Sequence, residues 1–304
     1  MNVYKCTIRT HNVLISLQTD SKGLYDYIQK DPFLHAHIAD AEILPGTSFQ
    51  ADFKIIHKSS RENQITMDER SLEIYANIPD VIKYSQIIFL LIPILEMFYE
   101  QNDIYSISGA AISNFENGLI LLGGQRAGKS TLTSILTKDN TLSYFSDERL
   151  LLNSEGGIFL GGNKAISLRK NIAESEMFST SEKGKFMVSS STNKLYYFPE
   201  TRRPKKAKLK YLCLIQLNNI PFYTVKLNNF DIKLQLYNNI TQTIRSCLNP
   251  IINLEFATPS FDNKTLSNKR LRKIAKLIDT QDIEGYELNG SIEEIKKWIK
   301  RKII

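Results

Sequence analysis

The sequence is poor in the residues that build disulfide staples and metal centres. It has only three cysteines, Cys6, Cys213 and Cys247, which are far apart and odd in number. Such a chain forms no disulfide framework, so we expect a reducing compartment. All four histidines precede residue 60. No spacing of histidine and cysteine fits zinc, and the missing histidine excludes a Ser-His-Asp nucleophile from the C-terminal half.

Long apolar runs are also absent. The longest, Ile87–Leu95, is interrupted by Pro93 and ended by Glu96. It is too short for a bilayer, which needs about 20 apolar residues. The first residues, Met1–Cys6, lack the apolar core of a signal peptide. We therefore expect a cytoplasmic protein with no membrane partner.

Composition and charge further limit the class of protein and the kind of ligand to expect. An apolar fraction of 42% and a charged fraction of 23% are ordinary for a globular protein and exclude a disordered chain. The 304 residues correspond to one large domain or two ordinary ones. Residues 1–100 carry 9 basic and 13 acidic residues, whereas residues 101–304 carry 30 and 19. This basic part suits an anionic ligand such as a nucleotide, or an acidic partner, although a solvated lysine-rich surface is the alternative.

Hydrophobic periodicity divides the chain into two units, of fold class α/β (α+β). Residues 1–100 are predicted to form a small β-rich unit that ends in an apolar helix over 80–99. Its other expected elements are strands within 3–18, 49–57 and 70–77 and a short helix within 21–30. Residues 101–304 are predicted to form a larger unit with a mixed sheet.

The second unit combines strand and helix signals with one irregular stretch. The expected strands lie within 104–113, 119–122, 141–152, 209–217, 222–227 and 285–288. Four helices are expected: one that begins at 129, two over 239–247 and 267–277, and one that follows 291. Asn117-Gly118 is a hairpin-turn signal, and Ser291 to Glu294 is a capping box. Residues 161–206 are polar and poorly periodic, so we expect little regular structure there.

One motif carries chemistry, and it fits the phosphate-binding pattern G-x-x-x-x-G-K-[ST] at every fixed position. Its residues are Gly123, Gly124, Gln125, Arg126, Ala127, Gly128, Lys129 and Ser130, followed by the hydroxyl of Thr131. The glycines let the backbone wrap closely around a phosphate, and the following helix adds positive charge at its N-terminus. Lys129 is expected to reach the terminal phosphates and Ser130 to ligate Mg²⁺.

An acidic pair follows this loop. Asp147 comes 17 residues after Ser130, at the end of a predicted strand, and Glu148 follows it directly. Two adjacent carboxylates allow one to hold Mg²⁺ and the other to accept a proton from an attacking hydroxyl. The alternative is an acidic turn paired with Arg149.

The order of these features resembles the HPr serine kinase/phosphorylase family, and especially its short relatives near lasso-peptide gene clusters. The resemblance covers 104–170, where small residues from 106 to 112 precede the phosphate loop, and the ending at 285–290. It implies that residues 101–304 form a P-loop kinase-like domain whose core is related to phosphoenolpyruvate carboxykinase. It further implies a kinase that uses ATP and Mg²⁺ to phosphorylate a serine of a peptide or protein. The family's paired acidic residues, usually Asp-Asp, fall on Asp147 and Glu148.

The chain departs from the pattern of this family at a residue that bears on the catalytic base. The family usually has a histidine where this chain has Ser108, so a carboxylate is expected to act alone. Asp147 is predicted to be the base or the metal ligand, with Glu148 as its partner and Lys129 as the phosphate clamp. The departure also allows a nucleotide-gated switch that has no phosphoryl acceptor.

The sequence does not decide which further cations lie near the phosphates or which partner the protein binds. Arg126, Lys164 and Arg169 are candidates for extra charge near the γ-phosphate. The run 202–210 has six cations in nine residues, which suit either an acidic substrate or an exposed loop. Because it lacks interleaved aromatic residues, nucleic acid is not favoured, although a kinase of a small molecule or of RNA remains an alternative. A basic stretch over 269–276 is predicted to be a solvated helix face, and a homo-oligomer is not excluded.

Overall fold

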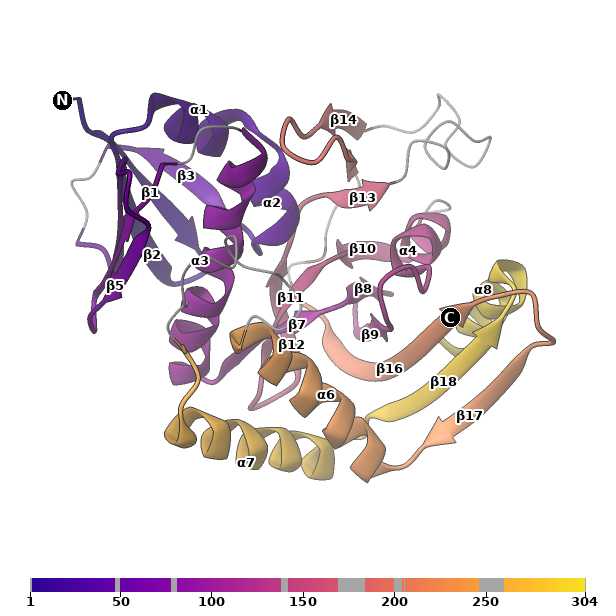
Figure 1. Cartoon of the computed structure of the whole chain (residues 1–304). Helices are drawn as coiled ribbons and strands as arrows, with labels where there is room; N and C mark the ends of the chain where they lie inside the picture. Colours follow the sequence, from indigo (N-terminus) through magenta and orange to yellow (C-terminus); the bar gives the residue numbers. More distant parts are fainter. Residues whose placement is uncertain are drawn as a thin grey trace.

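The protein, seen here as a computed structural model, is mixed α/β (Figure 1). The structure describes residues 2–46, 50–77, 81–137, 142–168, 184–199, 204, 206–245 and 260–303. These residues form two large sheets, one small sheet and seven helices. The mixed α/β class agrees with the prediction from the sequence.

The N-terminal sheet has six strands in the order β3-β1-β2-β4-β6-β5. They are β1 (Tyr4–Thr10), β2 (Val13–Thr19), β3 (Glu42–Pro45), β4 (Phe53–Lys58), β5 (Gln64–Met67) and β6 (Ser71–Tyr75). β1 and β2 form the predicted hairpin, whereas β2, β4 and β6 run parallel. Because side chains alternate across a strand, Val13, Ile15 and Leu17 all face the core. The short edge strands β3 and β5 were not predicted.

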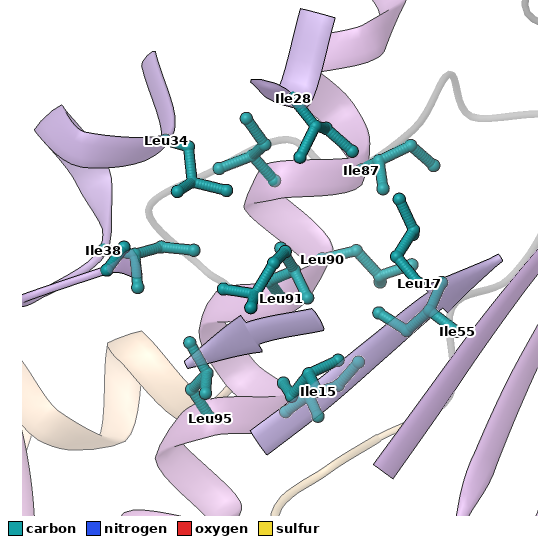
Figure 2. Close-up of a cluster of buried hydrophobic side chains, with 14 of the residues drawn as sticks. Ile15, Leu17, Ile28, Leu34, Ile38, Ile55, Ile87, Leu90, Leu91 and Leu95 are labelled. Atoms are coloured by element: carbon teal, nitrogen blue, oxygen red, sulfur yellow. The ribbon is translucent and has the colours of Figure 1, made fainter. Parts of the chain in front are cut away.

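Three helices lie against this core: α1 (Lys22–Lys30), α2 (Phe33–His37) and α3 (Val81–Gln101). α3 is apolar around most of its circumference and is buried, as the sequence predicted. Its Leu90 and Leu91 lie among side chains from the sheet and from the two shorter helices (Figure 2). Pro93 lies inside α3. Within the described ranges, no helix combines the length and apolarity needed to cross a bilayer.

The second sheet has nine strands and is mixed. Its main path is β10-β8-β9-β16-β12-β11-β7, and β18 and then β17 extend it beside β16. The strands are β7 (Ile104–Ser108), β8 (Ala110–Ser113), β9 (Asn117–Leu122), β10 (Ser143–Ser146), β11 (Arg149–Asn153), β12 (Ile158–Gly162), β16 (Lys208–Leu217), β17 (Tyr223–Leu227) and β18 (Glu284–Gly290). β9, β16 and β18 run parallel at its centre.

Helices cover both faces of this sheet. α4 (Lys129–Thr137) and α8 (Ile292–Ile303) pack against the face that includes Cys213. α6 (Asn229–Ile244) and α7 (Lys264–Thr280) pack against the other face, which includes Leu212. Consecutive residues of β16 therefore point to opposite helical layers, as the pleat requires. The predicted capping box is present, because Ser291 and Glu294 exchange hydrogen bonds at the start of α8.

Several local predictions were wrong. The strand expected over 104–113 is two strands, β7 and β8, which separate at Gly109 and pair with different partners. A Cβ at Gly109 would lie 2.9 Å from the Leu121 carbonyl oxygen, so a side chain would clash there. The hairpin turn lies at 114–116 instead of Asn117-Gly118, with Phe115 at φ 76°. α6 begins at Asn229, ten residues before the predicted start.

The stretch over 161–206 is more regular than the sequence predicted. It holds the end of β12 and a third sheet in the order β13-β15-β14. These strands are β13 (Ile166–Leu168), β14 (Gly184–Val188) and β15 (Leu195–Pro199). Their pairing partners lie up to 31 residues apart, and local periodicity does not detect such pairing.

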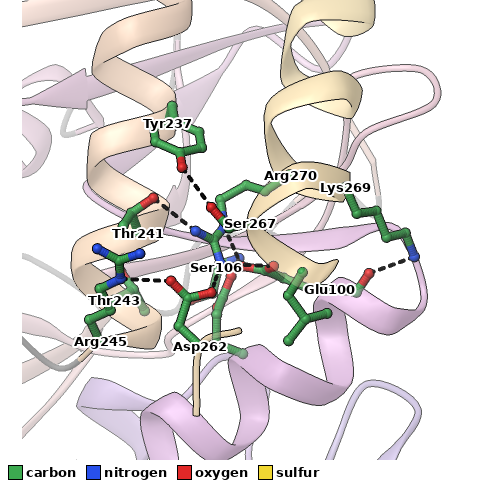
Figure 3. A network of polar contacts seen from close by, with 12 residues as sticks. Glu100, Ser106, Tyr237, Thr241, Thr243, Arg245, Asp262, Ser267, Lys269 and Arg270 are labelled. Atoms are coloured by element: carbon green, nitrogen blue, oxygen red, sulfur yellow. Dashed lines mark hydrogen bonds and ion pairs between the residues drawn. The ribbon is translucent and has the colours of Figure 1, made fainter. Parts of the chain in front are cut away.

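A buried ion network joins the end of α3 to α6 and α7 (Figure 3). Arg270 of α7 is fully buried and donates two hydrogen bonds to the carboxylate of Glu100, at 2.8 and 3.1 Å. It also donates to Asp262 and to Thr241 of α6. The prediction of a solvated face over 269–276 is therefore wrong at Arg270. Breaking such a buried pair by removing one partner is strongly destabilising, so this network fixes α7 against α3.

Truncating the core at Leu91 is expected to destabilise the whole chain. Leu91→Ala removes a fully buried side chain and leaves a cavity, which costs about 2–5 kcal/mol in the free energy of unfolding. Denaturant unfolding measures this difference. The matched control is Leu271→Ala on α7, whose side chain is 54% exposed, with an expected change within about 0.5 kcal/mol. Similar losses for both variants would contradict the described core.

Candidate functional site

The phosphate-binding motif forms a tight loop between β9 and α4. β9 ends at Leu122 and α4 begins at Lys129. Gly123 and Gly128 have φ values of 153° and 94°, a conformation that favours glycine. A Cβ at Gly128 would lie 2.2 Å from Leu217 Cδ1. The loop therefore needs glycine at both fixed positions, and it has the strand–loop–helix context that the motif predicts.

The charged and hydroxyl groups of the motif converge at the mouth of the loop. Lys129 Nζ donates to the carbonyl oxygens of Gly123 and Gly124, at 2.8 and 3.0 Å. Burial lowers the pKa of Lys129, whereas Glu148 and Asp147 act in the opposite direction. Ser130 Oγ donates to Asp147 Oδ2 at 3.0 Å. The predicted pair of Ser130 and Asp147 is thus in direct contact.

Asp147 has the features of a metal ligand. Its side chain is buried, and Oδ2 also accepts the backbone N–H of Ser167 at 3.0 Å. Its second oxygen, Oδ1, is buried with no hydrogen-bond partner among the described residues. Burial raises the pKa of Asp147 to about 7. An unsatisfied carboxylate oxygen beside a serine hydroxyl fits Mg²⁺, which takes few protein oxygens and completes its shell with phosphate and water.

Asn163, which the sequence did not single out, holds the acidic turn in shape. Its Oδ1 accepts the backbone N–H groups of Asp147, Glu148 and Arg149, at 2.9, 2.8 and 3.1 Å. Its Nδ2 donates to the Ala165 carbonyl at 2.6 Å. One buried amide therefore orients both carboxylates. Its only sequence signal was a polar residue after Gly161-Gly162, in a stretch expected to be irregular.

A histidine reaches the site from the N-terminal unit. His37 of α2 is buried, and its Nδ1 lies 3.7 Å from Glu148 Oε1. The hydroxyl of Tyr196 lies 3.4 Å from its Nε2. Burial lowers the pKa of His37 to about 4 despite the nearby Glu148, so the imidazole is neutral at pH 7. The P-loop half of the sequence has no histidine, so this imidazole comes to Glu148 from the N-terminal unit.

Glu148 is kept ionised by its surroundings. Desolvation favours its neutral form, but His37 and the cations Arg149, Lys194 and Lys129 outweigh desolvation and lower the pKa of Glu148. Arg149, which the alternative interpretation paired with the acidic turn, donates to Thr243 Oγ1 of α6 at 3.1 Å. Glu148 is 37% exposed on the cavity wall, so its carboxylate is accessible to a ligand.

The turn between β14 and β15 adds another wall, and the N-terminal unit holds it in place. Asp31 Oδ2 accepts both the backbone N–H and the hydroxyl of Ser190, at 2.7 and 2.6 Å. Tyr27 shares a 2.6 Å hydrogen bond with Ser191. Lys194, a few residues farther on, lines the site. Residues 1–100 therefore support the site through this turn and through His37, while the cavity lining itself comes from residues 108–242.

These elements enclose a cavity of about 1320 Å³. Its cationic lining residues are Arg126, Lys129, Arg149 and Lys194. Of the other predicted cations, Lys164 donates to the Ala41 carbonyl away from the cavity lining, and Arg169 lies outside the described residues. In the run 202–210, the described residues 204 and 206–210 do not line the cavity, and the other three are outside the described part.

Comparison with models of known protein families and with curated proteins gives no match for this chain. The geometry of the site is therefore the basis for inferring its function.

Asp147→Asn is expected to stabilise the metal-free protein by an amount that grows as the pH rises from about 4 to 7. Because the folded-state pKa of about 7 exceeds the unfolded one, the stability that the protonated acid contributes is complete below about pH 4 and is lost as the pH rises through 7. Asparagine does not ionise, so the advantage of the variant grows across that range, at about 1.4 kcal/mol per pKa unit.

Denaturant unfolding in the presence of a chelator, near both ends of this range, tests the prediction. Asp279→Asn, which removes an exposed carboxylate and its 2.6 Å ion pair with Lys233, measures the effect of losing a surface charge. An advantage of Asp147→Asn that does not change with pH would contradict the buried, protonated state.

Proposed function

We propose that this protein is an ATP-dependent phosphotransferase that transfers the γ-phosphate to a hydroxyl group. The observation that carries the proposal is the contact between Ser130 and the half-satisfied carboxylate of Asp147, beside Lys129 in a glycine loop. A loop that only binds phosphate does not need a second free carboxylate, yet Glu148 is ionised and accessible. The resemblance to HPr serine kinases supports a P-loop kinase core and a serine of a peptide or protein as acceptor.

The loop and its lysine act on the phosphates. The backbone N–H groups at the start of α4 and the ammonium of Lys129 would bind the β- and γ-phosphates. To do so, Lys129 exchanges its hydrogen bonds with Gly123 and Gly124 for phosphate oxygens. Ser130 and Asp147 would hold Mg²⁺, which when bound neutralises phosphate charge as it develops.

Glu148 is the base in this proposal. The acceptor oxygen forms a bond to the γ-phosphorus, the bond to the ADP oxygen breaks, and the hydroxyl proton passes to Glu148. Asp147 is less suited to this step, because both Ser130 and Ser167 donate to its Oδ2 and it faces the metal position. The neutral imidazole of His37 limits where the Glu148 carboxylate can lie.

The positions of His37 and of the run 202–210 bear on the two alternative functions. The switch without an acceptor drew its support from the missing histidine, and the presence of His37 beside Glu148 weakens that support. An acidic or nucleic-acid acceptor drew its support from the run 202–210, whose described residues are away from the cavity lining. A cytoplasmic location and the oligomeric state stay as predictions from the sequence.

Removing either charged group is expected to abolish transfer in different ways. Lys129→Ala should lose nucleotide binding and transfer together, because it removes the phosphate clamp. Glu148→Gln should retain ATP binding but lower the transfer rate by about 10²–10⁴, the contribution of a general base. Label from the γ-phosphate of ATP, incubated with Mg²⁺ and an extract of the source cells, measures transfer.

Glu116→Gln, on the exposed turn before β9, is the control for losing a carboxylate. It should behave like the unaltered protein. Equal transfer by Glu148→Gln and this control would refute the role of Glu148. Label found only as free phosphate would refute the phosphotransferase.

A further inference from the structure

One wall of the cavity is built from amides on a single helix. Four residues of α6 line it: Gln235, Asn238, Asn239 and Gln242. Their spacing of i, i+3, i+4 and i+7 puts them on one face of the helix. The neighbouring face of α6 is apolar and packs on the sheet through Ile232, Leu236 and Ile240. The burial of this adjacent face fixes the rotation of the helix and leaves the amide face on the cavity lining.

Hydrogen bonds set this face beside the carboxylates. Asn239 accepts the backbone N–H of Ser108 at 2.7 Å and donates to its carbonyl at 2.9 Å. Ser108 pairs with Arg149 across β7 and β11, directly after Glu148. Thr243, one turn farther along α6, accepts from Arg149. The C-terminal half of the amide face thus adjoins the end of the cavity where an acceptor hydroxyl would meet Glu148.

The chemistry of the wall selects among acceptors. Its four side chains carry no formal charge, whereas the cations of the cavity come from the phosphate loop, β11 and the β14–β15 turn. A carboxamide both donates and accepts, which matches the N–H and C=O of a peptide unit. A typical small-molecule site has about 300–1,000 Å³, so the cavity of about 1320 Å³ has room for a second substrate beside a nucleotide.

We propose that the amide face of α6 is the acceptor subsite, and that it binds the main chain of an extended, uncharged peptide segment whose serine hydroxyl lies at Glu148. This inference rests on the proposed phosphotransferase function and adds to it the recognition surface and the kind of flanking sequence. Asn239 fixes the backbone of Ser108, which leaves Asn238 and Gln242, both exposed on the cavity side, as the contacts with the peptide.

The test uses the full chain with Mg²⁺, γ-labelled ATP and short peptides that have one central serine and uncharged, acidic or basic flanks. We expect label in the peptides with uncharged flanks. In the double variant Asn238→Ala/Gln242→Ala, kcat/KM for these peptides should fall about tenfold or more, the effect of losing one or two hydrogen bonds. The KM for ATP should be unchanged.

Asn229→Ala is the matched control, because Asn229 is an exposed amide in the first turn of the same helix, away from the cavity lining. Its kcat/KM should equal that of the unaltered chain.

Each of the other possible results would contradict a specific part of the inference. A double variant that phosphorylates the uncharged peptides at the full rate would refute the subsite and leave the kinase intact. A raised KM for ATP with unchanged peptide kinetics would assign the amides to the nucleotide. Label only in acidic or basic peptides would refute the selection for uncharged segments. Label only in free phosphate would refute the phosphotransferase and the subsite together.

Discussion

Burial of α3 is the constraint on which the arrangement of the two units depends. A helix that is apolar around most of its circumference cannot be covered by one sheet, because a sheet meets only one side of it. The N-terminal sheet with α1 and α2 covers part of α3. The same apolar cluster takes Leu151 of β11, Ile244 of α6 and Leu266 of α7 from the second unit. The ion network around Arg270 then fixes the C-terminal end of α3 against α7. The two units consequently share one core.

The shared core determines which residues come together at the site. Because α2 packs against α3, His37 comes within reach of Glu148. Because α1 lies beside α2, Asp31 and Tyr27 can hold the β14–β15 turn that brings Lys194 to the cavity. The electrostatics depend on the same packing. Burial favours a neutral His37 and a protonated Asp147, while several cations keep Glu148 ionised. Two adjacent carboxylates thereby acquire different properties, which allows a division of labour between metal binding and proton transfer.

Hydrogen bonds from two asparagine side chains hold the backbone of the site in position. Asn163 holds three consecutive backbone N–H groups of the acidic turn, and Asn239 holds both polar atoms of the Ser108 backbone. A buried amide that satisfies several backbone groups is costly to replace, since each abandoned group would remain unpaired. Ser108 stands where the proposed resemblance to HPr serine kinases would place a histidine. In this chain its backbone serves as an anchor for α6, and the imidazole comes from another part of the sequence.

The sequence by itself determined the parts of the protein that depend on neighbouring residues. The strand, glycine loop and helix around Lys129, the β1–β2 hairpin, the buried helix α3 and the capping box of α8 all follow from local periodicity, turn chemistry and backbone conformation. The approach of Asp147 to Ser130 was also predictable, because both follow strands that end at one edge of the sheet. Only the tertiary structure decided what surrounds them. His37 lies more than a hundred residues from Glu148. Asn163 and Lys194 come from a stretch expected to be irregular, and the amides of α6 had no sequence signal for a place at the site. Polar side chains in such segments acquire a role only when the burial of apolar surface elsewhere brings them together.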